Sequence, residues 1–304
     1  MATAEHLVAD VAGAPFEAGL DRVLARPGPV TLMLHGFRYC PFHVPSPDDP
    51  ELRDPHRLIY ADRSEARCDR GASWPALLNR AGPVIGIGWP AMYDGTGGMA
   101  ALRGFGAVYA RAGEVGRQVA RLADRIAAVD PGRRIDVVAH SLGARVALAA
   151  LPHMRLAEPR RILLWGAAER LRPALKALDA ASDRTLVVNM RARANRRFDL
   201  AFDWRAPGRS APLGGGLAHR RSVDLLLDDP VVEERLVALG LPLGPRPAGA
   251  CHWSFYTRDG IGALHADLLD RPGIWRQDRI AALAATPGWR WPALSLPGRR
   301  PLGA

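Results

Sequence analysis

The chain has 304 residues, 48% of them hydrophobic, which is enough to bury the core of one α/β domain. Its net charge of +10 comes from arginines scattered along the chain, whereas a nucleic-acid-binding protein would cluster its basic residues or interleave them with aromatic ones. The sequence has no long apolar membrane-spanning stretch and no targeting leader, and its three cysteines lack metal-ligand spacing, so we expect a cytoplasmic protein without a membrane span or a metal.

Short runs rich in β-branched residues alternate with helical patterns, which is typical of a parallel sheet covered by helices on both faces. The expected strands are 30–34, 83–87, 135–139, 161–165 and 185–189. Between the second and third strands, apolar residues recur every three or four positions and predict a helix with one buried face, ending at the Asp-Pro-Gly sequence 130–132. This face consists of Val115, Val119, Leu122, Ile126 and Val129.

A long segment, 38–74, follows the first strand and is rich in proline and acidic residues. Long connections without clear periodicity often form lids over active sites, but they can also be loops packed on the surface. Both interpretations stay open for this segment. We expect one domain over residues 1–270, with 38–74 inserted in it, and a C-terminal tail packed on this domain over residues 271–304.

The third strand leads into Ala-His-Ser-Leu-Gly at 139–143, which matches the Gly-x-Ser-x-Gly motif except that Ala139 replaces the first glycine. The apolar run after Ser141 predicts a helix that ends before Pro152. Ser141 therefore lies at a strand-to-helix turn, which is where serine hydrolases hold their nucleophile. A serine that merely caps the helix would also fit this place.

A second sequence feature favours the nucleophile. The first strand ends in His35-Gly36-Phe37, the place where such hydrolases carry a loop that donates one N–H to the oxyanion. The other donor is the N–H of the residue after the nucleophile. We therefore predict an oxyanion hole made by the backbone N–H groups of Phe37 and Leu142.

The general base is expected late in the chain, because the order in these hydrolases is nucleophile, acid, histidine. His252, in the sequence Ala-Cys-His-Trp, is our candidate. His219 lies in a glycine-rich segment, and His265 is interpreted as a residue on the surface of the last helix. We also expect aromatic residues near strand ends to line an acyl pocket or to belong to the core. These are Trp89, Tyr93, Trp165 and Trp253.

These segments resemble a group of α/β-hydrolase-fold proteins from alphaproteobacteria that have no assigned substrate. The likeness extends from about residue 28 to about residue 270. Its most specific parts are VTLMLHGFRYCPFH, DPHRLIYA, IGIGWPA, IDVVAHSLGARVAL, NMRARANRRFDLAFD and CHWSFYTRDG. The resemblance implies an α/β-hydrolase fold and a catalytic triad that contains Ser141 and His252, but it implies no substrate.

The acid of the triad is less clear. The resemblance implies an Asn-Asp pair after the strand that corresponds to 185–189, and here this pair reads Asn195-Arg196. Asp199, one helical turn further on, is the nearest substitute, and we assign it the role of orienting His252. An asparagine can also orient a histidine, so Asn195 stays a second candidate. Three more aspartates could serve as the acid, namely Asp203, Asp224 and Asp228.

Together these features predict hydrolysis of a carboxylic ester or related acyl compound of small size, through an acyl-enzyme and without a cofactor. Ser141 attacks the acyl carbon, and His252 takes and returns the proton. A rival interpretation is a binding scaffold that has the hydrolase fold but no catalysis, which Arg196 at the acid position would favour. A second rival is a nucleic-acid-associated protein, which the positive net charge would favour.

Overall fold

The computed structural model describes residues 4–8, 20–47, 50–62, 71–93 and 98–284. Within these residues seven strands form one sheet in the order β1-β3-β2-β4-β5-β6-β7, with every neighbouring pair parallel. The strands are β1 (Ala4–Val8), β2 (Val30–Leu34), β3 (Val84–Gly88), β4 (Ile135–His140), β5 (Arg161–Trp165), β6 (Leu186–Arg191) and β7 (Ser222–Leu226). The five strands expected from the sequence are confirmed within two residues at each end, whereas β1 and β7 were not predicted.

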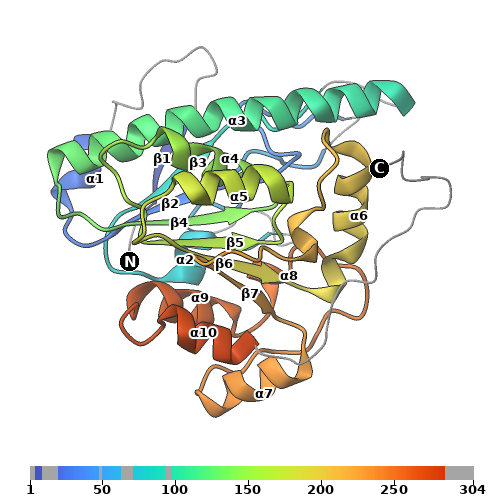
Figure 1. The fold of residues 1–304 in the computed structure, drawn as a ribbon. Coiled ribbons are helices and arrows are strands. Elements are labelled where there is room, and N and C mark those ends of the chain that lie inside the picture. Colours follow the sequence, from blue (N-terminus) through green and yellow to red (C-terminus); the bar gives the residue numbers. More distant parts are fainter. Residues whose placement is uncertain (1–3, 9–19, 48–49, 63–70, 94–97, 285–304) are drawn as a thin grey trace, which may run out of the picture.

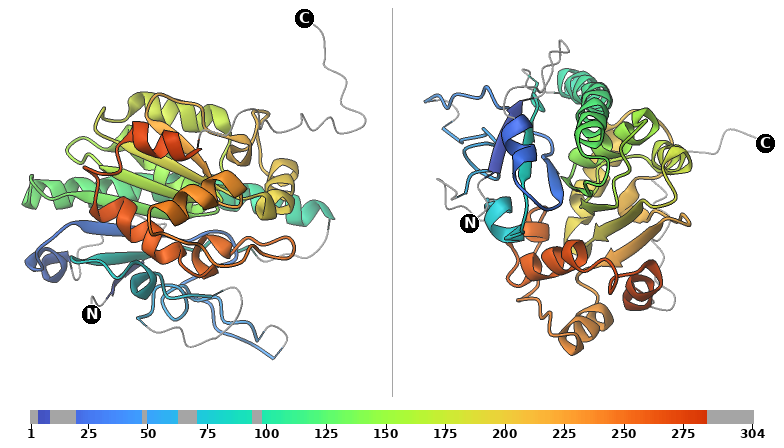
Figure 2. Two further views of the ribbon diagram at one scale, coloured as in Figure 1. Left: turned by 90° about the horizontal axis from the view of Figure 1, so that it is seen from below. Right: turned by 90° about the vertical axis from the view of Figure 1, so that its left-hand side faces the viewer.

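Helices cover both faces of this sheet (Figure 1). Along β2 the side chains alternate, so that Leu32 and Leu34 pack with one group of helices and Met33 with the other. The first group is α1 (Leu20–Ala25), α3 (Gly98–Val129), α4 (Gly143–Ala150) and α5 (Leu171–Ala180). The second group is α2 (Trp74–Leu78), α7 (Pro230–Ala238), α8 (Ser254–Thr257), α9 (Ile261–Asp270) and α10 (Gln277–Ala284). Figure 2 shows α3 and the pair α9 and α10 on opposite sides of the sheet.

The remaining elements lie in the connections: the short 3-10 helices η1 (Leu151–His153), η2 (Arg193–Asn195) and η3 (Leu213–Gly215), and the helix α6 (Arg196–Arg205). The expected parallel sheet with helices on both faces is therefore observed. Trp275 and Ile280, from the expected C-terminal tail, are buried in the same core as α9. Residues 285–304, with Trp289 and Trp291, lie outside the described residues.

The long helix α3 has the expected buried face, with one exception. Val115, Val119, Leu122 and Ile126 are buried, but Val129 is 53% exposed. A helix of 32 residues is about 48 Å long, far longer than strands of five or six residues. Figure 1 shows that α3 extends past the strands at both ends, so its last residue has no sheet to pack against.

Part of segment 38–74, around residues 53–60, is packed on the sheet, whereas Phe42 and Val44 are 68% and 80% exposed. Tyr60 is buried, and its hydroxyl donates a hydrogen bond to the carbonyl oxygen of Met33 at 2.9 Å. Ser73 accepts a hydrogen bond from the N–H of Ala76 and so caps α2, which begins at Trp74, the last residue of the segment. The segment therefore keeps a defined position over the carboxyl end of β2. Residues 48–49 and 63–70, with Cys68, lie outside the described part.

Candidate functional site

Ser141 lies on a sharp turn between β4 and α4. Its backbone φ is +54°, in the left-handed region, which costs a residue other than glycine about 1–2 kcal/mol. A capping serine would have an extended backbone and would accept an N–H of the helix, but the cap of α4 is Leu142, and no side chain caps this helix. The turn therefore has the strained geometry of a nucleophile and not the geometry of a helix cap.

Two glycines let the backbone come close to this turn. A Cβ atom at Gly143 would lie 2.2 Å from the carbonyl oxygen of Leu34, and one at Gly36 would lie 2.6 Å from the Cβ of Ser141. Ala139, which replaces the first glycine of the motif, is fully buried within β4, between β2 and β5. The close approach is therefore on the helix side of the serine, where the glycine is present.

Substitution of these two small residues is expected to have unequal effects. Gly143→Ala should destabilise the fold by at least about 1–3 kcal/mol, because its methyl group would overlap backbone atoms that cannot rotate away. Ala139→Gly, the matched control on the strand side, should cost about 1 kcal/mol or less. Urea unfolding of both variants measures the difference, and equal losses would show that the helix side has room to relax.

A cavity of about 820 Å³ lies at the carboxyl ends of β2, β4, β5 and β6. Ser141 and His252 lie together in its wall, and so do Phe37 and Leu142, the expected oxyanion residues. The structure thus brings the main predicted residues to one place. The other lining residues are Arg38, Tyr39, Pro50, Glu51, Leu52, Arg53, Leu58, Gly71, Phe105, His140, Gly166, Ala168, Asn195, Phe198, Asp199, Ala201, Phe202, Arg205 and Trp253.

His252 is held from three sides. Its Nδ1 lies 2.6 Å from Oδ1 of Asn195, and its ring stacks on Phe198 with centroids 4.7 Å apart. Its backbone oxygen lies 2.9 Å from Nε2 of His140, the residue before Ser141. Burial, and to a lesser extent the neighbouring His140, lowers the pKa of His252 well below its ordinary value. The imidazole is therefore neutral at neutral pH, which is the form that can accept a proton.

The residue that contacts the imidazole is Asn195, and Asp199 lies behind it. The Nδ2 of Asn195 donates a hydrogen bond to Oδ1 of Asp199 at 2.9 Å, across one turn from η2 into α6. The prediction that Asp199 itself orients His252 is therefore corrected: Asp199 acts on the amide, and the amide on the imidazole. Burial raises the pKa of Asp199 to about 7, against the opposing effects of Arg191 and of the Asn195 hydrogen bond.

Arg196, the second residue of the pair that the resemblance implies, is not among the residues that line the cavity. Asn195 is buried and lines the cavity, whereas the next residue, Arg196, is exposed. Consecutive residues at the start of a helix point about 100° apart, so only one of the pair can face the histidine. The second position of the pair is thus at the surface, and the asparagine faces the cavity.

Two of the three further aspartates have partners elsewhere. Asp203 is ion-paired with Arg170. Asp224 accepts hydrogen bonds from the N–H of Leu217, at 3.0 and 2.9 Å, and from Nδ2 of Asn189 at 2.7 Å. Both carboxylates therefore stabilise the fold around the site.

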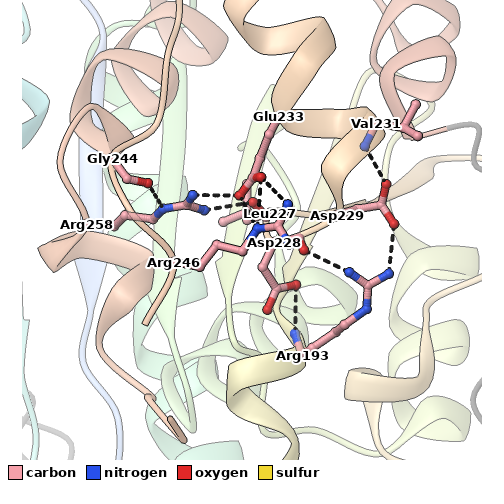
Figure 3. Close-up of polar contacts among 9 residues, drawn as sticks. All are labelled: Arg193, Leu227, Asp228, Asp229, Val231, Glu233, Gly244, Arg246 and Arg258. Atoms are coloured by element: carbon pink, nitrogen blue, oxygen red, sulfur yellow. Dashed lines mark hydrogen bonds and ion pairs between the residues drawn. The ribbon is translucent and has the colours of Figure 1, made fainter. Parts of the chain in front are cut away.

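Asp228, the third of these aspartates, holds the loop that carries Asn195. Its carboxylate accepts hydrogen bonds from the N–H groups of Arg193 at 2.8 Å and of Ala194 at 3.0 Å. The Arg193 guanidinium donates in turn to the backbone oxygen of Asp228 and to the Asp229 carboxylate, each at 2.8 Å (Figure 3). This network joins the connection after β6 to the connection after β7, and it fixes where η2 begins.

The connection after β6 also contacts the loop between α7 and α8, which carries His252. The N–H of Cys251 donates to the backbone oxygen of Ala194 at 2.9 Å, so the residues before His252 and before Asn195 are hydrogen-bonded to each other. Figure 3 also shows Arg258, in the chain after His252, bound to Gly244 and to Glu233 of α7. His252 and Asn195 are thus positioned by backbone bonds and an ion-pair network, and not by their own contact alone.

The loop after β2 is fixed by a buried histidine. The N–H of Trp89 donates to Nε2 of His35 at 3.0 Å, so the proton of the neutral ring is on Nδ1, which donates to the backbone oxygen of Gly36 at 2.9 Å. Burial lowers the pKa of His35 to about 3, which keeps the ring neutral. Among the residues that the structure describes, the N–H groups of Phe37 and Leu142 have no acceptor. Both are available to a ligand oxygen in the cavity.

The four aromatic residues considered for an acyl pocket divide between the cavity and the core. Trp253 lines the cavity, whereas Trp89 and Trp165 are fully buried in the core. Tyr93 stacks on Phe37, with ring centroids 5.7 Å apart. Only Trp253 of the four therefore borders the cavity directly.

The two histidines that competed with His252 lie elsewhere. His265 is fully buried, with Nε2 2.7 Å from the Phe255 oxygen, so its interpretation as a surface residue is wrong. His219 lies 3.1 Å from Asp179 and does not line the cavity. Neither is therefore placed to act on Ser141.

The apolar part of the cavity wall was not predicted from the sequence. Besides Phe37, it contains three phenylalanines, Phe105 of α3 and Phe198 and Phe202 of α6. Phe105 and Phe202 pack edge to face with centroids 6.2 Å apart. Apolar residues at helical spacing predict that one face of a helix is buried. They do not predict which cavity that face borders.

Within the described ranges, no helix is long and apolar enough to cross a membrane, and no group of three or more His, Cys, Asp or Glu side chains is arranged to hold a metal ion. Cys40 and Cys251 are free thiols.

No family model and no curated protein matches this sequence. Among solved structures, TT1662 from Thermus thermophilus is 14% identical, with a TM-score of 0.39 over 81% of this chain and 89% of its own. MenH from S. aureus is 11% identical, with a TM-score of 0.36 over 81% and 93% of the two chains. A lipase-esterase related protein from Clostridium acetobutylicum ATCC 824 is 7% identical, with a TM-score of 0.36 over 79% and 93%.

At these identities and TM-scores the likeness carries no information on activity, and the resemblance to the alphaproteobacterial group stays a prediction. The fold follows from the chain itself. A parallel sheet lies between helices, a serine lies on a strained turn after β4, and Asn195 and His252 follow later strands in that order. The chain has the α/β-hydrolase fold.

Proposed function

We propose that this protein is a serine hydrolase that cleaves a carboxylic ester or related acyl compound through an acyl-enzyme. The observation that carries the proposal is the left-handed backbone of Ser141, in the wall of a cavity that also contains His252. Strained backbone persists only where the surrounding structure enforces it, and a nucleophile on a strand-to-helix turn is the recognised reason for such strain in this fold.

In the proposed reaction, Oγ of Ser141 attacks the acyl carbon while Nε2 of His252 takes the hydroxyl proton. The N–H groups of Phe37 and Leu142 donate to the oxyanion that forms. The imidazolium then gives its proton to the leaving oxygen, and the acyl group remains on Ser141. A water molecule, activated by the same histidine, attacks the acyl-enzyme and releases the acid.

The pair Asn195 and Asp199 would select the tautomer of His252 that this reaction needs. An asparagine can present either its oxygen or its NH₂ group to the imidazole. Because the NH₂ group is bound to Asp199, the oxygen faces Nδ1, which must then carry the proton. This leaves the lone pair on Nε2 free to accept a proton from Ser141. Asp199 is thus a positioning residue that acts through Asn195.

Loss of this arrangement is expected to reduce turnover strongly. Asn195→Leu should lower kcat by up to about 10⁴-fold, since the imidazole loses the partner that defines its tautomer. Asp199→Ala should give a smaller loss, because the amide can then adopt either orientation. Arg196→Ala, an exposed neighbour on the same segment, is the control and should turn over normally. Stopped or continuous assays with 4-nitrophenyl esters measure all three, and full activity in Asn195→Leu would remove the amide from the mechanism.

The pH dependence should distinguish Asp199 from His252. The pKa of Asp199 is raised to about 7, so its carboxylate is present above this pH and is lost as pH falls through it. A protonated carboxyl can donate to the amide oxygen and turn it away from His252. We therefore expect activity to fall below about pH 7, although the pKa of His252 is lower still. In Asp199→Ala this step near pH 7 should disappear, and a step that persists would assign it to another group.

The same shift has a stability consequence of opposite sign. Since the folded pKa of Asp199 is above its unfolded value, stability from this group is fully present below about pH 4 and is lost as pH rises to about 7. Ionised Asp199 therefore holds Asn195 in the proposed geometry but lowers the free energy of unfolding. Such a cost is typical of a carboxylate that serves a function.

Covalent labelling tests the proposed function directly. A fluorophosphonate is expected to lose fluoride and to form an adduct on Ser141, located by mass mapping of peptides. A scaffold without catalysis would give no adduct, and an adduct elsewhere would move the nucleophile. A gel shift with nucleic acid that weakens steeply with salt would instead support a nucleic-acid-associated protein.

A further inference from the structure

Arg38 has a backbone conformation that its side chain disfavours. Its φ is +72°, in the left-handed region where glycine or asparagine is expected and where other residues are uncommon. The N–H of Arg38 donates to the backbone oxygen of Ala91 at 2.9 Å, which holds it there. Since glycine would satisfy the same backbone without strain, the side chain of Arg38 is the feature that needs an explanation.

Arg38 lines the cavity and directly follows Phe37, the proposed oxyanion donor. Arg38 is exposed, and among the described residues its guanidinium has no carboxylate partner. Many other arginines of the chain are ion-paired, for example Arg80 with Asp136 at 2.9 Å. Among the described residues, the charge of Arg38 is thus not neutralised by a carboxylate, and Arg38 directly follows the proposed oxyanion residue Phe37 in the chain.

The charges around the cavity are unbalanced. Among the described residues, three arginines line it, Arg38, Arg53 and Arg205, and Arg205 also has no carboxylate partner there. The described lining residues include two acids: Glu51, which pairs with Arg53 at 3.1 Å, and Asp199, which accepts a hydrogen bond from Asn195. Both of these acids are thus already engaged, so that within the described part of the chain the positive charges of Arg38 and Arg205 are available to a ligand.

We propose that the substrate carries an anionic group, separate from the scissile ester, and that Arg38 binds this group while the phenylalanine wall of Phe105, Phe198 and Phe202 contacts the apolar part between the two. Guanidinium groups recognise carboxylate and phosphate through paired hydrogen bonds. The substrate class is therefore an acidic acyl ester, such as a half-ester of a dicarboxylic acid. This inference rests on the proposed function for its position next to the oxyanion hole.

Two esters of equal chain length test it: 4-nitrophenyl hydrogen adipate, which bears a free carboxylate, and neutral 4-nitrophenyl hexanoate. Arg38→Asn removes the charge and tolerates the left-handed backbone, so the fold should be retained. The ratio of kcat/KM for the acidic over the neutral ester should fall by about 10- to 100-fold, which corresponds to one charge-assisted hydrogen-bonded pair. Arg209→Asn, an exposed arginine outside the cavity, removes the same charge and should leave the ratio unchanged.

Added glutarate and inorganic phosphate serve as competing anions. The anion that inhibits hydrolysis of the acidic ester more strongly shows whether the site prefers a carboxylate or a phosphate. Either preference supports the proposal. An equal ratio in the wild type, Arg38→Asn and Arg209→Asn overturns it, as does a wild-type preference for the neutral ester.

A binding measurement separates this inference from the proposed function. The Ser141→Ala variant should bind the intact adipate half-ester. Binding is followed by tryptophan fluorescence, to which Trp253 in the cavity wall contributes. The double variant with Arg38→Asn should bind this ester about 10- to 100-fold more weakly. If the wild type hydrolyses neither ester, the proposed function fails, yet the binding difference still supports an anion site. If both esters are hydrolysed but binding is the same with and without Arg38, only the anion site fails.

Discussion

Replacing Ser141 with alanine is expected to lower kcat on activated esters by roughly 10⁶-fold, because loss of the nucleophile disables the whole triad. The fold should remain, since the hydroxyl makes no capping bond to α4. Residual turnover should reflect binding and the oxyanion N–H groups of Phe37 and Leu142 alone. Initial rates with 4-nitrophenyl esters, together with a thermal melt, measure both parts of this expectation.

Ser182→Ala is the matched control, since it removes the hydroxyl of a serine that does not line the cavity. Ser141→Gly gives a second check, because glycine adopts a φ of +54° without strain. This variant should be as inactive as Ser141→Ala and at least as stable as the wild type. Turnover close to wild type in Ser141→Ala would show that another group attacks the substrate.

His252→Gln is expected to cause a loss of similar size, since a triad without its base is as impaired as one without its nucleophile. Glutamine keeps polar atoms near Asn195 but cannot take a proton from Ser141 and return it to the leaving oxygen. Measuring kcat and KM separately should place nearly all of the loss in kcat, because His252 acts on protons and not on substrate binding.

Cys251→Ser is the control for this change. Cys251 is a free thiol next to the base, and a thiol nucleophile would need its own turn and oxyanion donors. The serine variant should therefore keep the turnover of the wild type. An inactive Cys251→Ser beside an active His252→Gln would place the chemistry on the thiol.

Local sequence determined what could be predicted. The Ser141 turn, its helix and the position of Phe37 depend on contiguous residues, so the motif and its context sufficed. The strand β7 was missed because its short sequence includes the charged Asp224, which breaks the apolar run. His265 was misplaced although its spacing from Ile261, four residues, put it on the buried face of α9. That error could have been avoided from the periodicity alone.

The partner of His252 could not be settled in the same way. The contact joins residues 57 positions apart in the chain, and whether residue 195 or 196 faces the imidazole depends on the exact start of η2. That start is set by Asp228, which accepts the N–H groups of Arg193 and Ala194 from a different connection. If η2 began one residue later, Arg196 and not Asn195 would face the imidazole.

The loop that presents His252 has a consequence for how this protein responds to heat. Residues 239–253 contain no helix or strand, and a few backbone bonds hold the loop, among them that of Cys251 to Ala194. Segments with few buried contacts open at a lower free-energy cost than the core they rest on. Although His252 itself is held by Asn195, we therefore expect this loop to open on warming before the sheet unfolds, so that activity is lost reversibly below the melting temperature.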